Sequence, residues 1–402
     1  MRLPVIMMSI LFIVNFCADF IIWRDVKRSF KNRWQTKVVI ALLLSIWALL
    51  IIAVLSPRRD AGADLQPIMW MLYTFLSLFI PKLLYALFSL LSRVSLFWRA
   101  KHLSVLKYIG GVLSIVSFVA MWWGALVTRN DIEVTRQTVK FENLPKSFDD
   151  YKIVHISDIH AGTWGTDTAF LSNMVDTVNA LNPDLVLFTG DIVNRNTKEI
   201  YPFVNALSRL KAKQGVYSVL GNHDYGDYMD WSSAIERERN NRELIDVQNK
   251  MGWRMLNNEH CWVRKDNDSI AIIGVENWGE PPFSVYGDLR KAYSNLNDEN
   301  FKVLLTHNPE HWKREVSEIS NIDLSLSGHT HGMQFVLQFG DWKWSPAVWK
   351  YKEWGGLYTK ENPEGKELKL YVNIGLGEVA LPFRLGATPE VTLITLKKEN
   401  AQ

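Results

Sequence analysis

The segment from Val154 to Gln334 contains five short polar motifs: Asp158-Ile159-His160, Gly190-Asp191, Gly221-Asn222-His223-Asp224, Thr306-His307 and Gly328-His329-Thr330-His331. Each motif directly follows a short apolar run that is typical of a buried strand. Because ligand-binding side chains of α/β proteins gather at the carboxyl ends of strands, we expect the five motifs to meet at one site. Five of the nine histidines of the chain lie in these motifs.

After residue 128, short apolar runs typical of strands alternate with segments whose apolar residues have helical spacing. This pattern predicts an α/β domain. Asp131–Asn143 alternates apolar and polar residues as a half-exposed edge strand does, and helical spacing covers Ala169–Leu181 and Tyr201–Leu210. Buried strands are expected at Lys152–Ile156, Leu185–Phe188, Gly215–Leu220, Ser269–Val275, Lys302–Thr306, Leu324–Ser327, Leu368–Ile374 and Val391–Leu396. The expected result is two packed sheets flanked by helices.

The first 128 residues are dominated by four apolar segments, each long enough to cross a bilayer: Leu3–Trp23, Val38–Ser56, Pro67–Leu91 and Leu106–Thr128. The first segment has no small-residue cleavage site, and three more spans follow, so we favour a membrane helix over a signal peptide. We therefore predict a four-helix transmembrane anchor over residues 1–128 and a soluble domain over residues 129–402.

The loops between the spans carry unequal positive charge, which predicts the orientation of the protein. The first loop carries Arg24, Lys27, Arg28, Lys31, Arg33 and Lys37, and the third loop carries Arg93, Arg99, Lys101 and Lys107. In the second loop, Arg58 and Arg59 are offset by Asp60 and Asp64. Loops one and three are then cytoplasmic, and the soluble domain is extracytoplasmic. Within the spans, we expect Asp19 to lie near a helix end and Lys82 to reach the headgroups, rather than to form a functional pair.

The bulk composition excludes two classes of protein. A net charge of +3 gives no polyanion-binding signature, so nucleic acid is not expected as a partner. The two cysteines, Cys17 and Cys261, cannot form a disulfide framework.

The motifs together supply carboxylate, carboxamide and imidazole ligands, which suit two divalent cations. Asp191 is the candidate bridging ligand. The remaining ligands divide into two sets: Asp158, His160 and His331 for one cation, and Asn222, His307 and His329 for the other. Mn, Fe, Zn and Mg all accept such ligands, so the metals are not distinguished. Two cations about 3.5–4 Å apart suit in-line displacement at phosphorus by a bridging hydroxide.

Further residues near the motifs have candidate roles. His223 is placed to protonate the leaving oxygen or to stabilise transition-state charge, and Asp224 to orient its imidazole. Arg195 and Arg384 are candidate phosphate contacts. The alternative for Arg195 is a solvated arginine at a helix start, and Arg384 could hold either a substrate phosphate or a lipid head group. His155, His260 and His311 are expected to be structural or exposed.

The motifs resemble, one by one and in the same order, those of the calcineurin-like metallophosphoesterases. The phrases around them look most like the membrane-associated bacterial branch, over about Asp131 to Leu396. The resemblance implies a four-layer α/β/β/α sandwich, an integral protein of the bacterial inner membrane, and the ligand sets given above. Met333 stands where that branch often has glycine, which affects the loop shape but no ligand.

Two segments beside the motifs leave alternatives open. The loop 335–358 is rich in Trp, Tyr and Phe interleaved with Lys, and either folds onto its own domain or forms a patch at the membrane interface. Tyr225–Glu243 is an insertion after His223 that could act as a lid.

The sequence therefore predicts a membrane-anchored enzyme that hydrolyses phosphomonoesters or phosphodiesters, lipid-linked esters among them. The alternatives are hydrolysis of a soluble nucleotide-like diester and, from another class, a scaffold or sensor that binds without catalysis. The intact ligand set argues against the scaffold.

Overall fold

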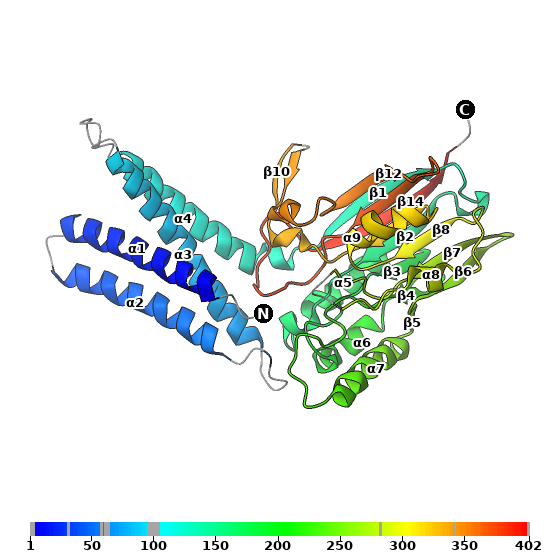
Figure 1. The fold of residues 1–402 in the computed structure, drawn as a ribbon, viewed down its shortest axis with the longest axis horizontal. Coiled ribbons are helices and arrows are strands. Elements are labelled where there is room, and N and C mark those ends of the chain that lie inside the picture. The colour runs from blue at the N-terminus through cyan, green and yellow to red at the C-terminus, as the bar shows by residue number, and fades with distance from the viewer. Residues whose placement is uncertain are drawn as a thin grey trace. The chain divides into compact units, whose positions relative to one another are not determined.

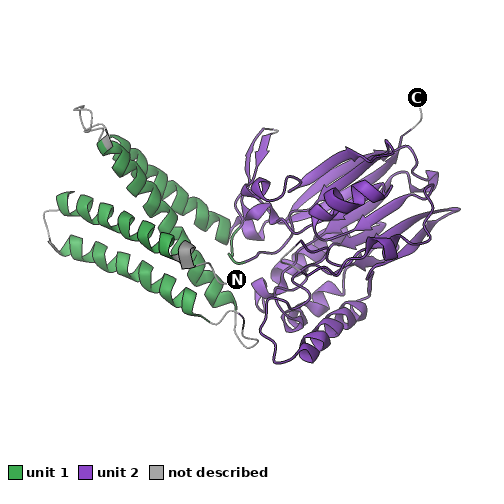
Figure 2. Ribbon diagram, in the orientation of Figure 1, with its two compact units in different colours: residues 1–58, 62–126, 380–383 green, residues 59–61, 127–379, 384–402 purple. Residues whose placement is uncertain are grey.

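The computed structural model describes residues 5–29, 33–56, 59, 65–94, 105–280, 284–340 and 342–399. The chain divides into two compact units (Figure 2). The first comprises residues 1–58, 62–126 and 380–383, and the second residues 59–61, 127–379 and 384–402.

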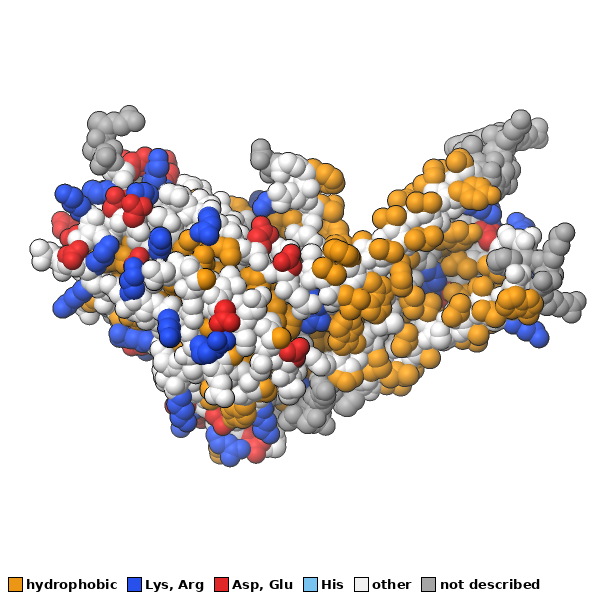
Figure 3. All heavy atoms as spheres, turned by 180° about the vertical axis from the view of Figure 1, so that it is seen from behind, with side chains coloured by type: hydrophobic (Ala, Val, Ile, Leu, Met, Phe, Trp, Pro, Cys, Tyr) orange, Lys and Arg blue, Asp and Glu red, His pale blue; other side chains and the backbone are white. Residues whose placement is uncertain are grey.

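The first unit is built from four long helices: α1 (Val5–Ser29), α2 (Arg33–Leu55), α3 (Leu65–Val94) and α4 (Val105–Leu126) (Figure 1). Within the described residues, three helices are long and apolar enough to cross a membrane: Trp34–Leu55, Leu65–Arg93 and Val105–Asn130. Figure 3 shows that apolar side chains cover much of the surface of this unit. The four predicted helices are thus present.

A buried polar cluster joins three of these helices, contrary to our expectation for Asp19 and Lys82. Because α1 continues to Ser29, Asp19 lies well inside the helix. Its Oδ1 atom is 2.7 Å from Lys82 Nζ on α3, and its Oδ2 atom accepts a hydrogen bond of 2.7 Å from Trp47 Nε1 on α2. The pair forms because the Lys82 side chain is 5% exposed, and a buried ammonium requires a counter-charge.

Several loop residues that support the predicted orientation lie outside the described residues: Lys31, Arg58, Asp60, Asp64, Arg99 and Lys101. The orientation therefore stays a prediction.

The second unit contains two six-stranded sheets and a separate hairpin. The first sheet has the order β1 (Glu133–Phe141), β14 (Glu390–Lys398), β2 (Tyr151–Ile156), β3 (Leu185–Phe188), β4 (Val216–Ser218), β5 (Trp253–Met255). The second has the order β12 (Gly356–Glu361), β13 (Glu367–Val372), β9 (Leu324–Ser327), β8 (Lys302–Leu305), β7 (Asp268–Gly274), β6 (Glu259–Lys265). The hairpin consists of β10 (Leu337–Phe339) and β11 (Trp342–Trp344).

Short and long helices complete this unit. The α-helices are α5 (Ala169–Ala180), α6 (Val204–Leu207), α7 (Ala234–Lys250), α8 (Leu289–Tyr293), α9 (Pro309–His311) and α10 (Ser317–Ile319). The 3-10 helices are η2 (Thr128–Asn130), η3 (Lys146–Phe148), η4 (Ala161–Trp164), η5 (Thr197–Phe203), η7 (His331–Gln334) and η8 (Pro346–Trp349), and η6 (Trp312–Val316) is a π-helix.

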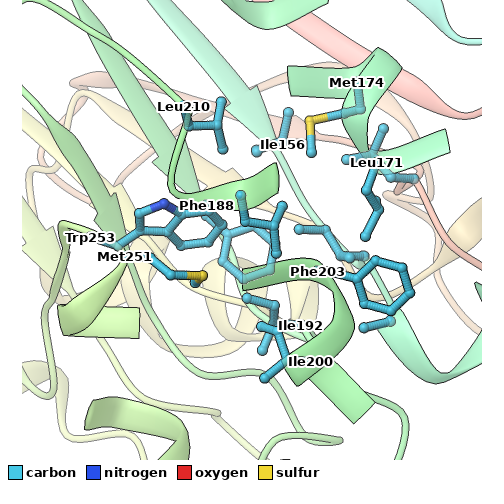
Figure 4. Close-up of a cluster of buried hydrophobic side chains, with 14 of the residues drawn as sticks. Ile156, Leu171, Met174, Phe188, Ile192, Ile200, Phe203, Leu210, Met251 and Trp253 are labelled. Carbon is cyan, nitrogen blue, oxygen red and sulfur yellow. The ribbon is translucent and has the colours of Figure 1, made fainter. Parts of the chain in front are cut away.

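Alternation along the strands produces four layers. In β3, Leu185 and Leu187 face the core between the sheets, while Val186 and Phe188 face the core under α5 and α7. In the second sheet, Leu304 of β8 belongs to a third core on the opposite side. Figure 4 shows the helix-side core, in which Phe188 and Trp253 lie near Met251. Three cores between four layers confirm the predicted α/β sandwich.

Most of the predicted strands are confirmed to within two residues, and β3 and β9 have the predicted bounds. One prediction in the helical layer is wrong. Tyr201–Leu210 is not one helix, because η5 contains Pro202 and only Val204–Leu207 is α-helical. In the insertion Tyr225–Glu243, the helix α7 begins at Ala234, and it packs Leu244 and Val247 into the core.

We expect breaking the Asp19–Lys82 pair to destabilise the helical unit. Asp19→Leu or Lys82→Met alone leaves one buried charge without its partner, which costs about 3 kcal/mol. The double variant removes both charges and should recover much of that loss. The measurement is the apparent melting temperature of the full chain in detergent, with Lys27→Met, at an exposed position of α1, as the control. Single variants that melt like this control would contradict the prediction.

Candidate metal centre

The five motifs lie at the carboxyl ends of strands of both sheets, as predicted. Asp158 and His160 follow β2, Asp191 follows β3, and Asn222 follows β4. From the second sheet, His307 follows β8, and His329 and His331 follow β9. Because these are neighbouring strands in each sheet, the polar turns meet where the two sheets face one another.

The turns adopt backbone conformations that L residues rarely take. Asp158, His160, Asp191, His329 and His331 all have positive φ, between 45° and 72°. Such residues cluster at functional sites, where surrounding structure maintains the strain. The turns also pack closely. A Cβ on Gly190, whose φ is 97°, would lie 2.3 Å from the Gly221 nitrogen, so only glycine fits there.

The first ligand group is Asp158, His160 and His331, all of them buried. The Nε2 atoms of His160 and His331 are 3.2 Å apart, and His331 Nε2 is 3.2 Å from Asp158 Oδ1. The Asp158 carboxylate also accepts the backbone N–H of His329 at 3.0 and 3.2 Å from its two oxygens. Two imidazole nitrogens and a carboxylate oxygen therefore converge on one point.

The second group is Asp191, His307 and His329, joined by Asn222. His307 donates from Nδ1 to the Thr189 carbonyl at 2.8 Å, so Nε2 is the nitrogen that carries the lone pair when the ring is neutral. That lone pair faces three further acceptor atoms: Asp191 Oδ2 at 3.1 Å, Asn222 Oδ1 at 3.0 Å and His329 Nδ1 at 3.1 Å. Acceptors that face one another in a buried site repel unless a proton or a cation lies between them, so this donor set fits a bound cation.

Asp191 lies between the two groups. Its Oδ2 atom is 3.6 Å from His160 Nε2 in the first group and 3.1 Å from His307 Nε2 in the second. Its other oxygen, Oδ1, accepts the backbone N–H of His223 at 2.8 Å. One carboxylate thus faces both ligand groups.

The electrostatics of the cluster favour ligands in their metal-binding form. Burial opposes the charge on Asp158 and Asp191, but the imidazoles outweigh it and hold the pKa of each carboxyl well below its usual range. Burial and then the charge of His307 lower the pKa of His329 to about 3, so this ring is neutral. His307 is the exception. Burial opposes its charge, but Asp191 raises its pKa to about 9, which marks the position where positive charge is most stabilised.

His223 lies beside the cluster, with its ring centroid 4.9 Å from that of His160. Its Nδ1 atom donates to the Asn194 carbonyl at 2.7 Å, which leaves Nε2 as the available nitrogen. His223 and His329 are half-buried, whereas Asp158, His160, Asp191 and His307 are buried. The side of the cluster that reaches solvent therefore includes His223.

The expected contact between Asp224 and the His223 imidazole is wrong. The Asp224 carboxylate instead accepts four backbone N–H groups, from Gly221, Asp191, Ile192 and Val193, at 2.8 to 3.2 Å. The main chain after β3 therefore uses this carboxylate to satisfy its donors, and the Asn194 carbonyl orients His223. Burial and then Asp191 raise the pKa of Asp224 to about 7.

Two tyrosines that the sequence analysis did not identify as site residues contact the cluster. Tyr228 accepts a hydrogen bond of 2.8 Å from Asn222 Nδ2, which turns the carboxamide oxygen toward His307, and its ring stacks on His223 at 4.3 Å. The Tyr351 hydroxyl is 2.8 Å from His329 Nε2. Tyr228 lies in the insertion, six residues after Asn222. This short separation in sequence is the only signal that could have predicted its contact with Asn222.

Arg195 and Arg384 both lie near the cluster, in different surroundings. Arg195 is 7% exposed, and its Nε atom is 3.4 Å from Glu199 Oε1. Arg384 is fully buried and donates to the carbonyls of Gly377, Ala387 and Ile374, with Nη2 also 3.2 Å from His331 Nδ1. These bonds give Arg384 a positioning role behind His331, and a phosphate contact by either arginine stays a prediction.

Three further histidines in the described part of the chain contact structural partners, and the backbone at Met333 explains the preference for glycine at that position. His155 is hydrogen-bonded to Thr189 Oγ1, His311 to Thr306 Oγ1 and His260 to the Ala292 carbonyl. Met333 has a φ of 45° directly after Gly332, a conformation that glycine adopts more easily.

Comparison with known proteins assigns this fold and site to one family. Residues 151–333 match the family described as "Calcineurin-like phosphoesterase", and residues 1–129 match "Probable Calcineurin-like phosphoesterase, transmembrane domain". The metallophosphoesterase YkuE of Bacillus subtilis is 33% identical over 273 residues, which cover 67% of this chain and 87% of that protein. The chain therefore belongs to the calcineurin-like metallophosphoesterases and carries the transmembrane domain of a membrane-bound branch, which confirms the resemblance of its motifs.

Two further relatives have more specific names. The transmembrane protein with metallophosphoesterase domain of Danio rerio is 28% identical over 294 residues, which cover 71% of this chain and 62% of that protein. The UDP-2,3-diacylglucosamine pyrophosphatase LpxG of Chlamydia muridarum is 26% identical over 324 residues, which cover 67% of this chain and 92% of that protein.

We expect Asp224→Asn to destabilise the catalytic unit. The amide nitrogen of Asn cannot accept hydrogen bonds, so about two of the four N–H groups lose their acceptor, at a cost of about 3 kcal/mol. The measurement is the apparent melting temperature of the full chain in detergent. Asp176→Asn is the matched control, because that carboxylate is 62% exposed and pairs with Arg209 at the surface, at 3.0 Å. Equal melting of the two variants would show that the Asp224 bonds contribute little.

Proposed function

We propose that this protein hydrolyses phosphate esters, monoesters or diesters, at a centre for two divalent cations, and that lipid-linked esters are among its substrates. One observation carries the proposal: Asp191 faces both ligand groups, with Oδ2 3.6 Å from His160 Nε2 and 3.1 Å from His307 Nε2. A shared carboxylate is what two cations require in order to remain close despite their repulsion.

The ligands divide between two positions. Asp158, His160 and His331 would hold one cation, Asn222, His307 and His329 would hold the other, and Asp191, which faces both groups, would serve both. Two divalent cations bound there supply the positive charge that activates a water and stabilises an in-line displacement at phosphorus. Mixed nitrogen and oxygen ligands suit Mn, Fe, Zn and Mg alike.

The protein's own residues orient the ligands and move the proton. In its imidazolium form, His223 would donate the Nε2 proton to the leaving oxygen, because its Nδ1–H is engaged by the Asn194 carbonyl at 2.7 Å. Tyr228 fixes the Asn222 carboxamide, and the Thr189 carbonyl fixes the tautomer of His307. Asp224 acts through the backbone of the turn that carries Asp191.

The substrate class follows from the membrane region and from one relative. This chain has long apolar helices, so its catalytic domain works beside a bilayer. LpxG is named for a pyrophosphatase acting on a diacylated sugar nucleotide, which is a phosphate ester with acyl chains. Both observations favour a lipid-linked ester over a soluble nucleotide-like diester.

The proposed arrangement in the membrane places residues 1–128 as a four-helix anchor and residues 129–402 as the catalytic domain on the extracytoplasmic side. The excess of Lys and Arg in the first and third loops supports this orientation. The chain is then a protein of the bacterial inner membrane.

The first test is hydrolysis of an aryl phosphodiester and an aryl monoester by the purified full chain with Mn²⁺. Asp191→Asn should lose both metal content and turnover, because the shared ligand is weakened. His223→Ala should retain its metal content and lose turnover by about 10²–10⁴-fold, as expected for removal of a general acid. Asp176→Asn, at an exposed carboxylate, is the control.

The outcomes separate the alternatives. Competition by lipid phosphates supports a lipid-linked substrate, and hydrolysis unaffected by them favours a soluble diester. Full metal content in Asp191→Asn would remove the bridging assignment. Absence of turnover with Mn²⁺, Fe²⁺, Zn²⁺ or Mg²⁺ would favour the scaffold.

Orientation is tested separately. A reporter that is active only outside the cytoplasm, fused after Gln402, should be active, and one that is active only inside should be silent. Fusions after Ser56, in the second loop, should report the same side. The opposite pattern would reverse the proposed topology.

A further inference from the structure

The most unusual surface of the catalytic unit is a group of exposed apolar side chains that directly follows the last metal-ligand motif. They lie on the hairpin β10–β11 and on η8 (Figure 1), and we call them the aromatic edge: Leu337, Phe339, Trp342, Val348 and Trp349. Phe339 is 70% exposed, Trp342 55% and Trp349 79%. Large aromatic side chains seldom lie so open in water, which marks a surface that another medium covers.

The hairpin is not part of either six-stranded sheet. Its two strands pair only with each other in the described part of the chain, and all of β10 is exposed. A two-stranded hairpin alone is marginally stable in water. Phe339 and Trp342 stack on each other at 6.0 Å, rather than on the domain. The hairpin therefore presents its aromatic rings outward.

The same segment is fixed to the metal centre at its base. Ser345 Oγ donates to the Gly332 carbonyl at 2.6 Å, and Thr330 Oγ1 donates to the Trp354 carbonyl at 2.6 Å. Tyr351, two residues after Trp349, contacts His329 Nε2 at 2.8 Å. The position of the aromatic edge is thus coupled to the ligand turn at the centre.

The chemistry of the edge matches one occupant, the interface of a lipid bilayer. Trp and Tyr favour the headgroup level of membranes, and Lys is attracted to anionic headgroups. Lys343 lies between Trp342 and Trp344, and Lys350 and Lys352 follow Trp349. Lys350 pairs with Glu280 at 2.9 Å, while Lys343 and Lys352 are exposed. Lysine is depleted in protein–protein interfaces, whereas anionic headgroups attract it, so the exposed lysines favour lipid.

We propose that the aromatic edge inserts into the headgroup region of the bilayer in which the helices of the same chain are embedded. The tether keeps the bilayer at a high effective concentration, so a small patch suffices for docking. Docking orients the ligand turn toward phosphates at the membrane surface. That last consequence rests on the proposed function, whereas insertion of the edge does not.

The test measures contact of the edge with lipid in the full chain. Cys17 and Cys261 are replaced by Ala, and Phe339→Cys carries an environment-sensitive fluorophore. The chain is reconstituted in nanodiscs of phosphatidylcholine and phosphatidylglycerol, with and without lipids that carry a spin label near the headgroup. Ile235→Cys is the matched control, because Ile235 is apolar, 78% exposed and on α7 of the same unit.

Quenching by the labelled lipids that is several-fold greater at position 339 than at 235 would support the insertion. Equal, weak lipid quenching, with both positions accessible to iodide, would overturn it. Protection from iodide at 339 without lipid quenching would also overturn it, in favour of a protein or a second copy as the occupant. None of these readouts depends on turnover, so loss of the proposed activity and loss of docking are separate results.

Discussion

The structure of this centre depends on the confinement of carboxylate and imidazole acceptors in a volume that water scarcely reaches. Asp158, Asp191 and His307 are fully or almost fully buried, and the His307 lone pair faces oxygen and nitrogen acceptors at 3.0 to 3.1 Å. Such an assembly is unfavourable by itself, because each group has lost its water. The fold must therefore hold the groups rigidly, and positive charge must stabilise them.

The rigidity comes from the backbone more than from the ligands. Each turn is tied to its neighbour: the Asp158 N–H donates to the Gly190 carbonyl at 2.9 Å, and the Gly328 N–H donates to the His307 carbonyl at 3.0 Å. Asp224 then links the turns after β3 and β4 through four N–H bonds. Left-handed residues are tolerated at these ligands because this network over-determines them.

The ligands were predictable from sequence because each follows a strand that is apolar enough to recognise. Asp158, Asp191 and His307 need only the strand period and the rule for strand ends. The supporting contacts were not predictable in the same way. The roles of Asp224 and Asn194 depend on which N–H groups remain unpaired after the turn forms, and Tyr351 reaches His329 across a loop of irregular backbone. Local pattern also failed at α7, whose polar sequence packs only Leu244, Val247 and a few neighbours inward.

A buried charge chain explains how the catalytic unit begins. Arg129, three residues after the end of α4 at Leu126, pairs with the fully buried Glu378 at 3.0 Å and lies over the Trp164 ring. Burial raises the pKa of Glu378 to about 7, and the charges of Arg129 and Arg384 oppose that shift. Arg384, the second cation that acts on Glu378, supports the Gly377 carbonyl and lies beside His331. The first residues after α4 are therefore part of the packing around His331, a candidate ligand of the centre.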